Sequence, residues 1–384
     1  MIKIGFVYFD DIHIIPHFVG LVAELYNDPE CEVDILTPDI EQAYLYMMLN
    51  RLNVPNSVVK KLPTYWYKRI AYKFQKRKKP SNQYIFKKHR KKFLDYDILV
   101  FNVFNHTHLR RKDRNKPKFV FLMHGAGDRD YPFTPEYRPF IEKFDLITTA
   151  GPKINDLFAR MGKFEHTKFE TCGYQKFDII KKIQKNKKKL FNNNKPIVLY
   201  NPHFKPHLSS YFKFGDQILE YFYQNPEYNL IFAPHMNLFS PNIKGSQNPE
   251  SIKQKYFEAP NIIIDFGSEK SVDMTYTLNA DVYLGDVSSQ VYEFLLQKPK
   301  PVIFINAHDF NWHNDIHFQN WHLGKVIKNL EDLPELLLKR NIWQKEFEEK
   351  QKKAIAYTFD IQKEKNAAKR AAEAIKKLAK NNDK

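Results

Sequence analysis

Short apolar segments alternate with helical segments along most of the chain, and this alternation restricts the fold more than any other feature. In the first half the apolar segments are rich in Ile, Val and Phe, as strands buried on both faces should be. They span residues 3–8, 32–36, 97–101, 118–123 and 145–149, and helical patterns cover 17–26, 41–49, 64–79, 84–93 and 153–161. Alternating strands and helices predict a parallel sheet covered by helices on both faces.

A polar, lysine-rich run at residues 181–195 interrupts the pattern and has the composition of a linker. Beyond it the alternation restarts, with strands expected at 197–200, 229–233, 262–266, 282–284 and 302–305 and helices at 215–223, 271–279, 288–296 and 332–339. An amphipathic helix is expected over 367–380. We therefore expect two α/β domains, 1–190 and 191–340, followed by C-terminal helices over 341–384.

The chain has 384 residues, which is long enough for each of two domains to bury its own core. No apolar run approaches the roughly 20 residues that span a bilayer, and the N-terminus has the pattern of a first strand rather than of a signal peptide. Two cysteines, Cys31 and Cys172, cannot build a disulfide framework. These features favour a cytoplasmic location.

The net charge of +17 favours a polyanionic partner: nucleic acid, an anionic membrane surface or a phosphorylated substrate. Much of the excess lies in residues 60–92, which carry 14 Lys or Arg and no Asp or Glu. Within this run, residues 64–79 are bounded by prolines and place Trp66, Ile70 and Phe74 on one apolar stripe among basic side chains. We expect this helix to lie on an anionic membrane through Trp66, Lys68, Arg69, Lys73, Lys76, Arg77, Lys78 and Lys79. Alternatively, the stripe packs on the protein's own sheet, or the charge attracts nucleic acid.

Ligands of open α/β sheets bind beyond the carboxyl ends of the strands, so the residues that follow each strand are the candidates for chemistry. His124 and Gly125 follow the strand at 118–123. An imidazole there can act as a base or a hydrogen-bond donor, while glycine lets a ligand approach the backbone. Arg129 could reach a phosphate. The alternative is an ordinary glycine turn that happens to contain a histidine.

Imidazole and ammonium groups also follow two strands of the second half. His203 and Lys205 lie in a proline-bounded loop after the strand at 197–200, and His235 follows the strand at 229–233. An ordinary polar loop is the alternative at the first of these places.

A pair of serines opens the helix expected at 288–296. Ser288 and Ser289 come directly after Asp286 and Val287, beyond the strand at 282–284. Hydroxyls, free backbone N–H groups and the helix dipole together predict a phosphate site. Either serine could instead be a simple helix cap.

Four strand-end motifs, in this order, resemble those of the CDP-glycerol glycerophosphotransferase family, the polyol-phosphate transferases of teichoic acid and capsule synthesis. The His-Gly motif of that family matches His124-Gly125, and its Tyr-x-Pro-Thr-Trp-Arg motif matches residues 200–205, which read Tyr-Asn-Pro-His-Phe-Lys. A His-Pro-type motif matches the surroundings of His235, and an Asp-Tyr-Ser-Ser motif matches residues 286–289, where Val287 replaces the tyrosine. The resemblance covers roughly residues 95–305.

The resemblance implies a GT-B architecture, in which two Rossmann-like domains face each other across a cleft, and an enzyme that works without a bound metal or other cofactor. The donor would be a CDP-activated polyol, above all CDP-glycerol, on the second domain. The acceptor would be a hydroxyl of a lipid-linked or growing cell-envelope polymer at the inner face of the cell membrane. His124 would deprotonate that hydroxyl, and His235 would stabilise charge on the leaving nucleotide. The substrate-binding residues would be Gly125, Arg129, His203, Lys205, Asp286, Ser288 and Ser289.

Two other classes of function remain open. Another GT-B enzyme is the nearest, either a nucleotide-sugar glycosyltransferase or a UDP-N-acetylglucosamine 2-epimerase, whose Asp-Ser-Gly-Gly loop resembles residues 286–289. A nucleic-acid-binding protein using the basic run is the second. We expect no nucleic-acid partner, because the run lies between candidate strands of an α/β domain and the sequence has no nucleic-acid module signature.

Overall fold

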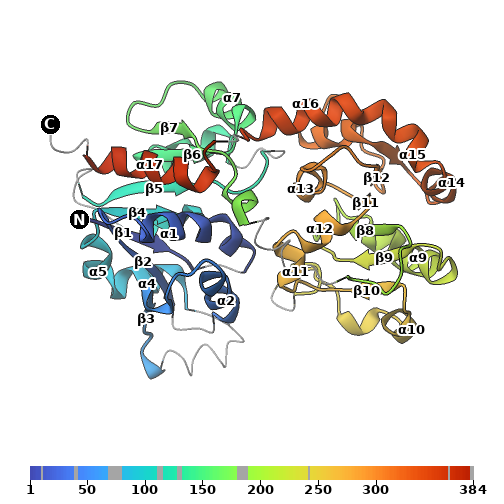
Figure 1. Cartoon of the computed structure of the whole chain (residues 1–384), viewed down its shortest axis with the longest axis horizontal. Coiled ribbons are helices and arrows are strands. Elements are labelled where there is room, and N and C mark those ends of the chain that lie inside the picture. The colour runs from blue at the N-terminus through green and yellow to red at the C-terminus, as the bar shows by residue number, and fades with distance from the viewer. Residues whose placement is uncertain are drawn as a thin grey trace. The chain divides into compact units, whose positions relative to one another are not determined.

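The computed structural model describes residues 1–9, 12–38, 42–67, 80–109, 116–127, 132–179, 189–240, 243–361 and 364–380. These residues form two compact units (Figure 1). Unit 1 contains the described residues up to Gly127, those from 132 to 179, and those from Tyr357 onward. Unit 2 contains the described residues from 189 to Ala356.

Unit 1 is built on a seven-stranded sheet in which every pair of neighbouring strands is parallel. Its order across the sheet is β3 (Val59–Leu62), β2 (Cys31–Pro38), β1 (Ile2–Val7), β4 (Ile98–Phe101), β5 (Lys118–Leu122), β6 (Leu146–Thr149) and β7 (Lys168–Thr171). The order reverses between β1 and β4. Two carboxylates fix the register of neighbouring strands at the amino ends of the sheet. Asp97 accepts a hydrogen bond from the backbone N–H of Lys3, and Asp145 accepts one from the backbone N–H of Phe119, both at 2.7 Å.

Helices cover the sheet of unit 1. They are α1 (Val19–Tyr26), α2 (Ala43–Arg51), α4 (Asn82–Lys88), α5 (Arg90–Leu94), α6 (Arg138–Ile141), α7 (Pro152–Arg160) and α17 (Ala367–Lys380). Two short 3₁₀ segments matter for the site: η1 (Ile12–His17) follows β1, and η5 (Gln175–Ile179) follows β7. The helices α1 and α17 pack against each other, and α17 also contacts β5 and β6 (Figure 1).

Unit 2 is built on a six-stranded, all-parallel sheet. Its order is β10 (Ile262–Ile264), β9 (Asn229–Phe232), β8 (Ile197–Asn201), β11 (Val282–Gly285), β12 (Val302–Ile305) and β13 (Lys325–Ile327), so the order reverses between β8 and β11. The helices are α9 (Tyr211–Gln224), α10 (Gln254–Glu258), α11 (Glu269–Val272), α12 (Thr275–Asn279), α13 (Gln290–Leu295), α14 (Leu333–Leu338), α15 (Arg340–Trp343) and α16 (Glu348–Thr358), of which α16 ends in unit 1.

The α/β fold class and the helical C-terminal region are confirmed. The expected strands all form, within one or two residues of their predicted ends. Three strands were not predicted: β3, β7 and β13. The helix expected at 271–279 is two helices, because Met274 between them has a positive φ of 68°. The helix expected at 64–79 lies outside the described residues from Lys68 onward.

The last helix is fastened to unit 1 by charged groups. The carboxylate of Asp178 in η5 accepts from the first N–H groups of α17, those of Ala367 at 3.3 Å and Ala368 at 2.7 Å. Farther along α17, Lys376 contacts Asp28 and Glu30, both at 2.5 Å. The sequence analysis treated residues 341–384 as one C-terminal region, but the structure divides them between the two units.

Candidate active site

Each sheet has one place where strand order reverses, and there the loops leaving two neighbouring strands diverge and leave room for a ligand. In unit 1 these are the loops after β1 and β4, and in unit 2 the loops after β8 and β11. The residues singled out in unit 2 by the sequence follow β8, β9 and β11. His124 follows β5, one strand beyond the reversal in unit 1.

Asp286 organises the loop that leaves β8. Its side chain is fully buried, and its Oδ2 accepts hydrogen bonds from the backbone N–H groups of His203 and Ser210, both at 2.9 Å. Burial raises the pKa of this carboxyl to about 7, and hydrogen bonds from Ser210 and His203 oppose the rise. The sequence predicted that Asp286 contacts substrate. In the structure its hydrogen bonds to the backbone position the loop that carries His203 and Lys205.

His203 and His235 present the same tautomer. The Nδ1 of His203 accepts from the backbone N–H of Lys205 at 3.0 Å, and the Nδ1 of His235 accepts from that of Asn237 at 3.2 Å. A neutral imidazole whose Nδ1 is an acceptor carries its proton on Nε2. The ring centroids lie 5.9 Å apart, and the Phe204 ring stacks on His203 at 4.7 Å and lies tilted to His235 at 4.5 Å. The Nε2–H group of each of these two imidazole rings is therefore a hydrogen-bond donor.

The two serines after β11 differ in their surroundings. The Oγ of Ser288 accepts from the N–H of Gln290 at 3.2 Å, so this half-buried serine, one residue before the N-cap position of Ser289, binds the first N–H group of α13. Ser289 is exposed and makes no side-chain cap bond. Of the two interpretations left open by the sequence, the cap therefore fits Ser288, while the Ser289 hydroxyl is available to a ligand.

In unit 1, the surroundings of His124 keep its imidazole neutral. Burial lowers its pKa to about 4, with a smaller contribution from His13, so the imidazole is neutral at pH 7. Its buried Nδ1 makes no hydrogen bond to any described residue. Gly125, the next residue, has a φ of 94°, which favours glycine, and no atom within 4 Å of where a Cβ would stand. Arg129 lies outside the described residues.

The sequence analysis did not find the neighbours of His124. His17 in η1 lies 5.7 Å from His124 between ring centroids, and Tyr174, just before η5, lies 5.1 Å from His17. His17 follows the first strand, as the other candidates follow theirs. That position was the available signal, but no glycine or repeated motif marks it.

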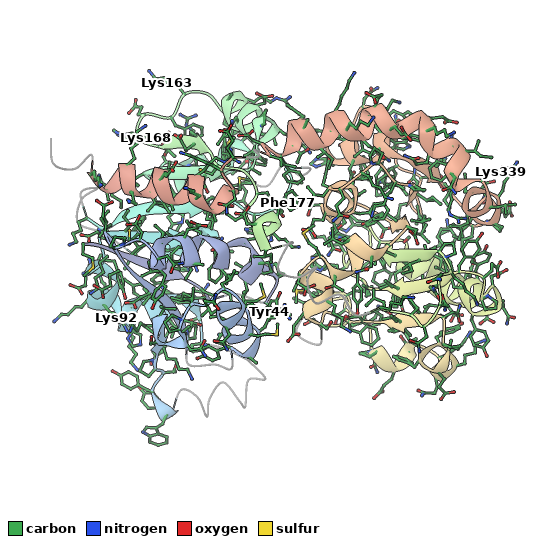
Figure 2. The ribbon with its side chains drawn as sticks, viewed as in Figure 1. Tyr44, Lys92, Lys163, Lys168, Phe177 and Lys339 are labelled. Carbon is green, nitrogen blue, oxygen red and sulfur yellow. The ribbon has the colours of Figure 1, made fainter. Side chains whose placement is uncertain are left out.

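The basic run divides into two parts with different environments. In α4 and α5 the apolar side chains Ile85, Phe86 and Phe93 are fully buried on the sheet, while basic residues such as Lys92 lie on the outside (Figure 2). By contrast, Tyr65, Trp66 and Tyr67 are 49%, 73% and 50% exposed. The other residues assigned to a membrane contact, Lys68, Arg69, Lys73, Lys76, Arg77, Lys78 and Lys79, lie outside the described residues.

Comparison with known proteins decides the family. Residues 56–377, which span both units, match the family described as CDP-glycerol:poly(glycerophosphate) glycerophosphotransferase. The chain belongs to this family. It is therefore a transferase, and the resemblance noted in the sequence is confirmed. No curated protein matches the chain.

Solved structures with the same architecture include members of two enzyme groups. A structure of the wall teichoic acid polymerase TagF with CDPG is 14% identical, with a TM-score of 0.65 over 100% of this chain and 89% of that one. A putative UDP-N-acetylglucosamine 2-epimerase from Listeria monocytogenes is 14% identical, with a TM-score of 0.61 over 98% and 96%. The enzyme from Neisseria meningitidis bound to UDP-GlcNAc is 12% identical, with a TM-score of 0.55 over 99% and 100%. At these identities the likeness supports the GT-B fold.

Proposed function

We propose that this glycerophosphotransferase moves glycerol phosphate from CDP-glycerol to a hydroxyl of a lipid-linked or growing teichoic-acid-like polymer of the cell envelope. The acceptor oxygen attacks the phosphorus that bears glycerol, the bond from that phosphorus to the bridging oxygen breaks, and CMP leaves with the electron pair. The observation that carries the proposal is the family match across both units, with imidazole groups at the carboxyl ends of both sheets.

The two units contribute residues with different roles in this reaction. In unit 2, His203, His235 and Lys205 stabilise the negative charge that develops on the leaving CMP, because Nε2–H and ammonium groups donate to phosphate oxygens. Ser289 adds a hydroxyl for the donor pyrophosphate. In unit 1, neutral His124 accepts the proton of the attacking hydroxyl.

A panel of activated donors tests this assignment. We expect CMP release from CDP-glycerol in the presence of a glycerol-phosphate acceptor, and much less from CDP-ribitol or UDP-N-acetylglucosamine. Chromatography of the nucleotides and mass analysis of the acceptor give the result. Conversion of UDP-N-acetylglucosamine to its 2-epimer, or UDP release with sugar transfer, would replace the proposal by one of the two GT-B alternatives.

Alanine substitutions at the two serines after β11 should have different effects, one on stability and the other on donor binding. Ser288→Ala removes the cap of α13 and should cost about 1 kcal/mol of unfolding free energy, a usual cap contribution. Ser289→Ala should leave thermal stability unchanged and weaken CDP-glycerol binding several-fold. Calorimetric titration and thermal unfolding of both variants give the comparison. If Ser289→Ala binds the donor as the wild type does, Ser289 has no part in the phosphate site.

We further propose that the exposed aromatic residues Tyr65, Trp66 and Tyr67 lie at an anionic membrane surface. The rings of Tyr65 and Tyr67 stack at 5.5 Å, and the ammonium of Lys88 lies 3.7 Å from the Tyr65 ring centroid. Exposed aromatic rings beside cations suit the boundary between headgroups and acyl chains. Among the described residues, no helix has the length and apolarity needed to span a bilayer.

Flotation with vesicles tests the membrane contact. The wild type should float with vesicles that contain anionic lipid and not with neutral vesicles. Trp66→Ala should reduce flotation severalfold, while Tyr26→Ala, a change at another exposed aromatic of unit 1, should not. Activity on a short soluble acceptor should be equal in both variants. Equal flotation of Trp66→Ala and Tyr26→Ala would exclude this surface.

A further inference from the structure

Three histidines gather at the carboxyl edge of the unit 1 sheet, and the reaction described above uses one of them. η1, which follows β1, carries His13 and His17, and His124 follows β5. The ring centroids of His13 and His17 lie 6.5 Å and 5.7 Å from that of His124. Two imidazoles beside the proposed base therefore have no assigned part in the chemistry.

A buried lysine stands next to this cluster. η5 packs against η1 and carries Lys176, which is only 4% exposed. Burial holds the pKa of His17 well below its usual value, and the positive charge of Lys176 is the next cause, ahead of His124 and His13. Lys176 and His17 thus lie on two elements that pack against each other, and the neutral imidazole of His17 can donate a hydrogen bond at pH 7.

Other groups near the cluster are donors too. Gln175, beside Lys176, is 2% exposed, and its buried Nε2 makes no hydrogen bond to any described residue. The first turn of α1 begins directly after His17 and has no side-chain cap. The acidic residue of η5, Asp178, is bonded to the start of α17 instead. The described groups around His124 therefore include an ammonium group, a neutral imidazole and an amide N–H group, which can all donate hydrogen bonds.

We propose that Lys176 and His17 bind a phosphate group of the acceptor, next to His124. This proposal rests on the proposed function, since a poly(glycerophosphate) acceptor carries a phosphate close to its terminal hydroxyl. Binding that phosphate would hold the hydroxyl near His124 and would discriminate against neutral alcohols. The same groups would also fit a phosphate of the donor, so the experiment must separate the two sources.

Direct binding is the first measurement. With saturating CDP-glycerol present, calorimetry should show that the wild type binds sn-glycerol 3-phosphate and does not bind glycerol. Lys176→Met should weaken that binding about 10- to 100-fold, the loss expected for a buried hydrogen bond from a charged group. Lys118→Met is the matched control, because Lys118 begins β5 at the opposite edge of the sheet. Thermal unfolding establishes that each variant is folded. If Lys176→Met does not fold, His17→Asn replaces it as the test variant, with the same expected loss of binding.

The outcomes separate the possibilities. Equal binding by the wild type and Lys176→Met, or no binding of glycerol 3-phosphate by the wild type, overturns the proposal. If Lys176→Met instead weakens CDP-glycerol binding by the same factor, the site belongs to the donor. Steady-state kinetics give the second measurement. In Lys176→Met the KM for a phosphate-terminated acceptor should rise, and the KM for CDP-glycerol should stay the same. A wild type that binds glycerol 3-phosphate but releases no CMP from CDP-glycerol would refute the proposed function and leave the phosphate site standing.

Discussion

Replacing His124 by alanine should lower the rate of transfer by about 100-fold or more, the usual contribution of a positioned general base. The residue fits this role because its imidazole is kept neutral by burial and its Nδ1 makes no hydrogen bond to any described residue. Purified variant and wild type should be compared by CMP release at saturating CDP-glycerol. The loss should appear in kcat, because the residues that we propose for donor binding are in unit 2.

The exposed histidine His166 provides a control for this change. Its side chain is 63% exposed, so His166→Ala should keep wild-type turnover. The pH profile gives an independent check. Because the pKa of His124 is about 4, its neutral form dominates from pH 6 to pH 8, and protonation should remove activity only as the pH falls toward 4. A folded His124→Ala enzyme with normal turnover would remove this residue from the mechanism.

Asp286→Ala should be the most destabilising change near the site. The carboxylate accepts from two buried backbone N–H groups, those of His203 and Ser210, and alanine leaves both without an acceptor. Each unsatisfied buried group costs roughly 1–3 kcal/mol, so the unfolding free energy should fall by about 2–6 kcal/mol. Donor binding should fall as well, since the loop that carries His203 and Lys205 loses its anchor. Denaturant unfolding and calorimetry measure the two effects.

The conservative variant Asp286→Asn keeps an acceptor oxygen and removes the titration. In the wild type the pKa of this carboxyl is about 7 when folded, above the value near 3.8 of a free aspartate. A raised pKa means that the folded state holds the proton more tightly than the unfolded state. The wild type should therefore lose stability relative to Asp286→Asn as the pH rises from about 4 to about 7. Parallel stability curves for the two proteins would contradict the burial argument.

The strands that the sequence predicted and those it missed differ in position. Inner strands are buried on both faces and appear as continuous apolar runs, such as Ile98–Phe101. The missed strands β3, β7 and β13 are edge strands, paired on one side only. Their sequences, VKKL, KFET and KVI, are short and partly charged, as edge strands usually are. A pattern method that looks for apolar runs cannot separate such strands from loops.

The candidate site was predictable where a motif follows a strand, and unpredictable where the fold alone brings residues together. His124, His203 and His235 were found because each lies within three residues of the end of a predicted strand. His17 and Lys176 are 159 positions apart in the sequence, and only the packing of η5 against η1 makes them neighbours. Asp286 was found as a polar strand-end residue, but its inward direction depends on the backbone of the loop after β8.

The placement of α17 has a consequence for the order of folding. Unit 2 is nearly continuous in the sequence, whereas unit 1 needs residues from Tyr357 onward, which leave the ribosome after all of unit 2. Until α17 arrives, the face of β5 and β6 that it contacts stays uncovered and Asp178 has no helix start to bind. During synthesis unit 2 can therefore complete its core while unit 1 is still incompletely folded, although the N-terminal part of unit 1 is synthesised first. The nascent N-terminal half would then be the part that most depends on chaperones.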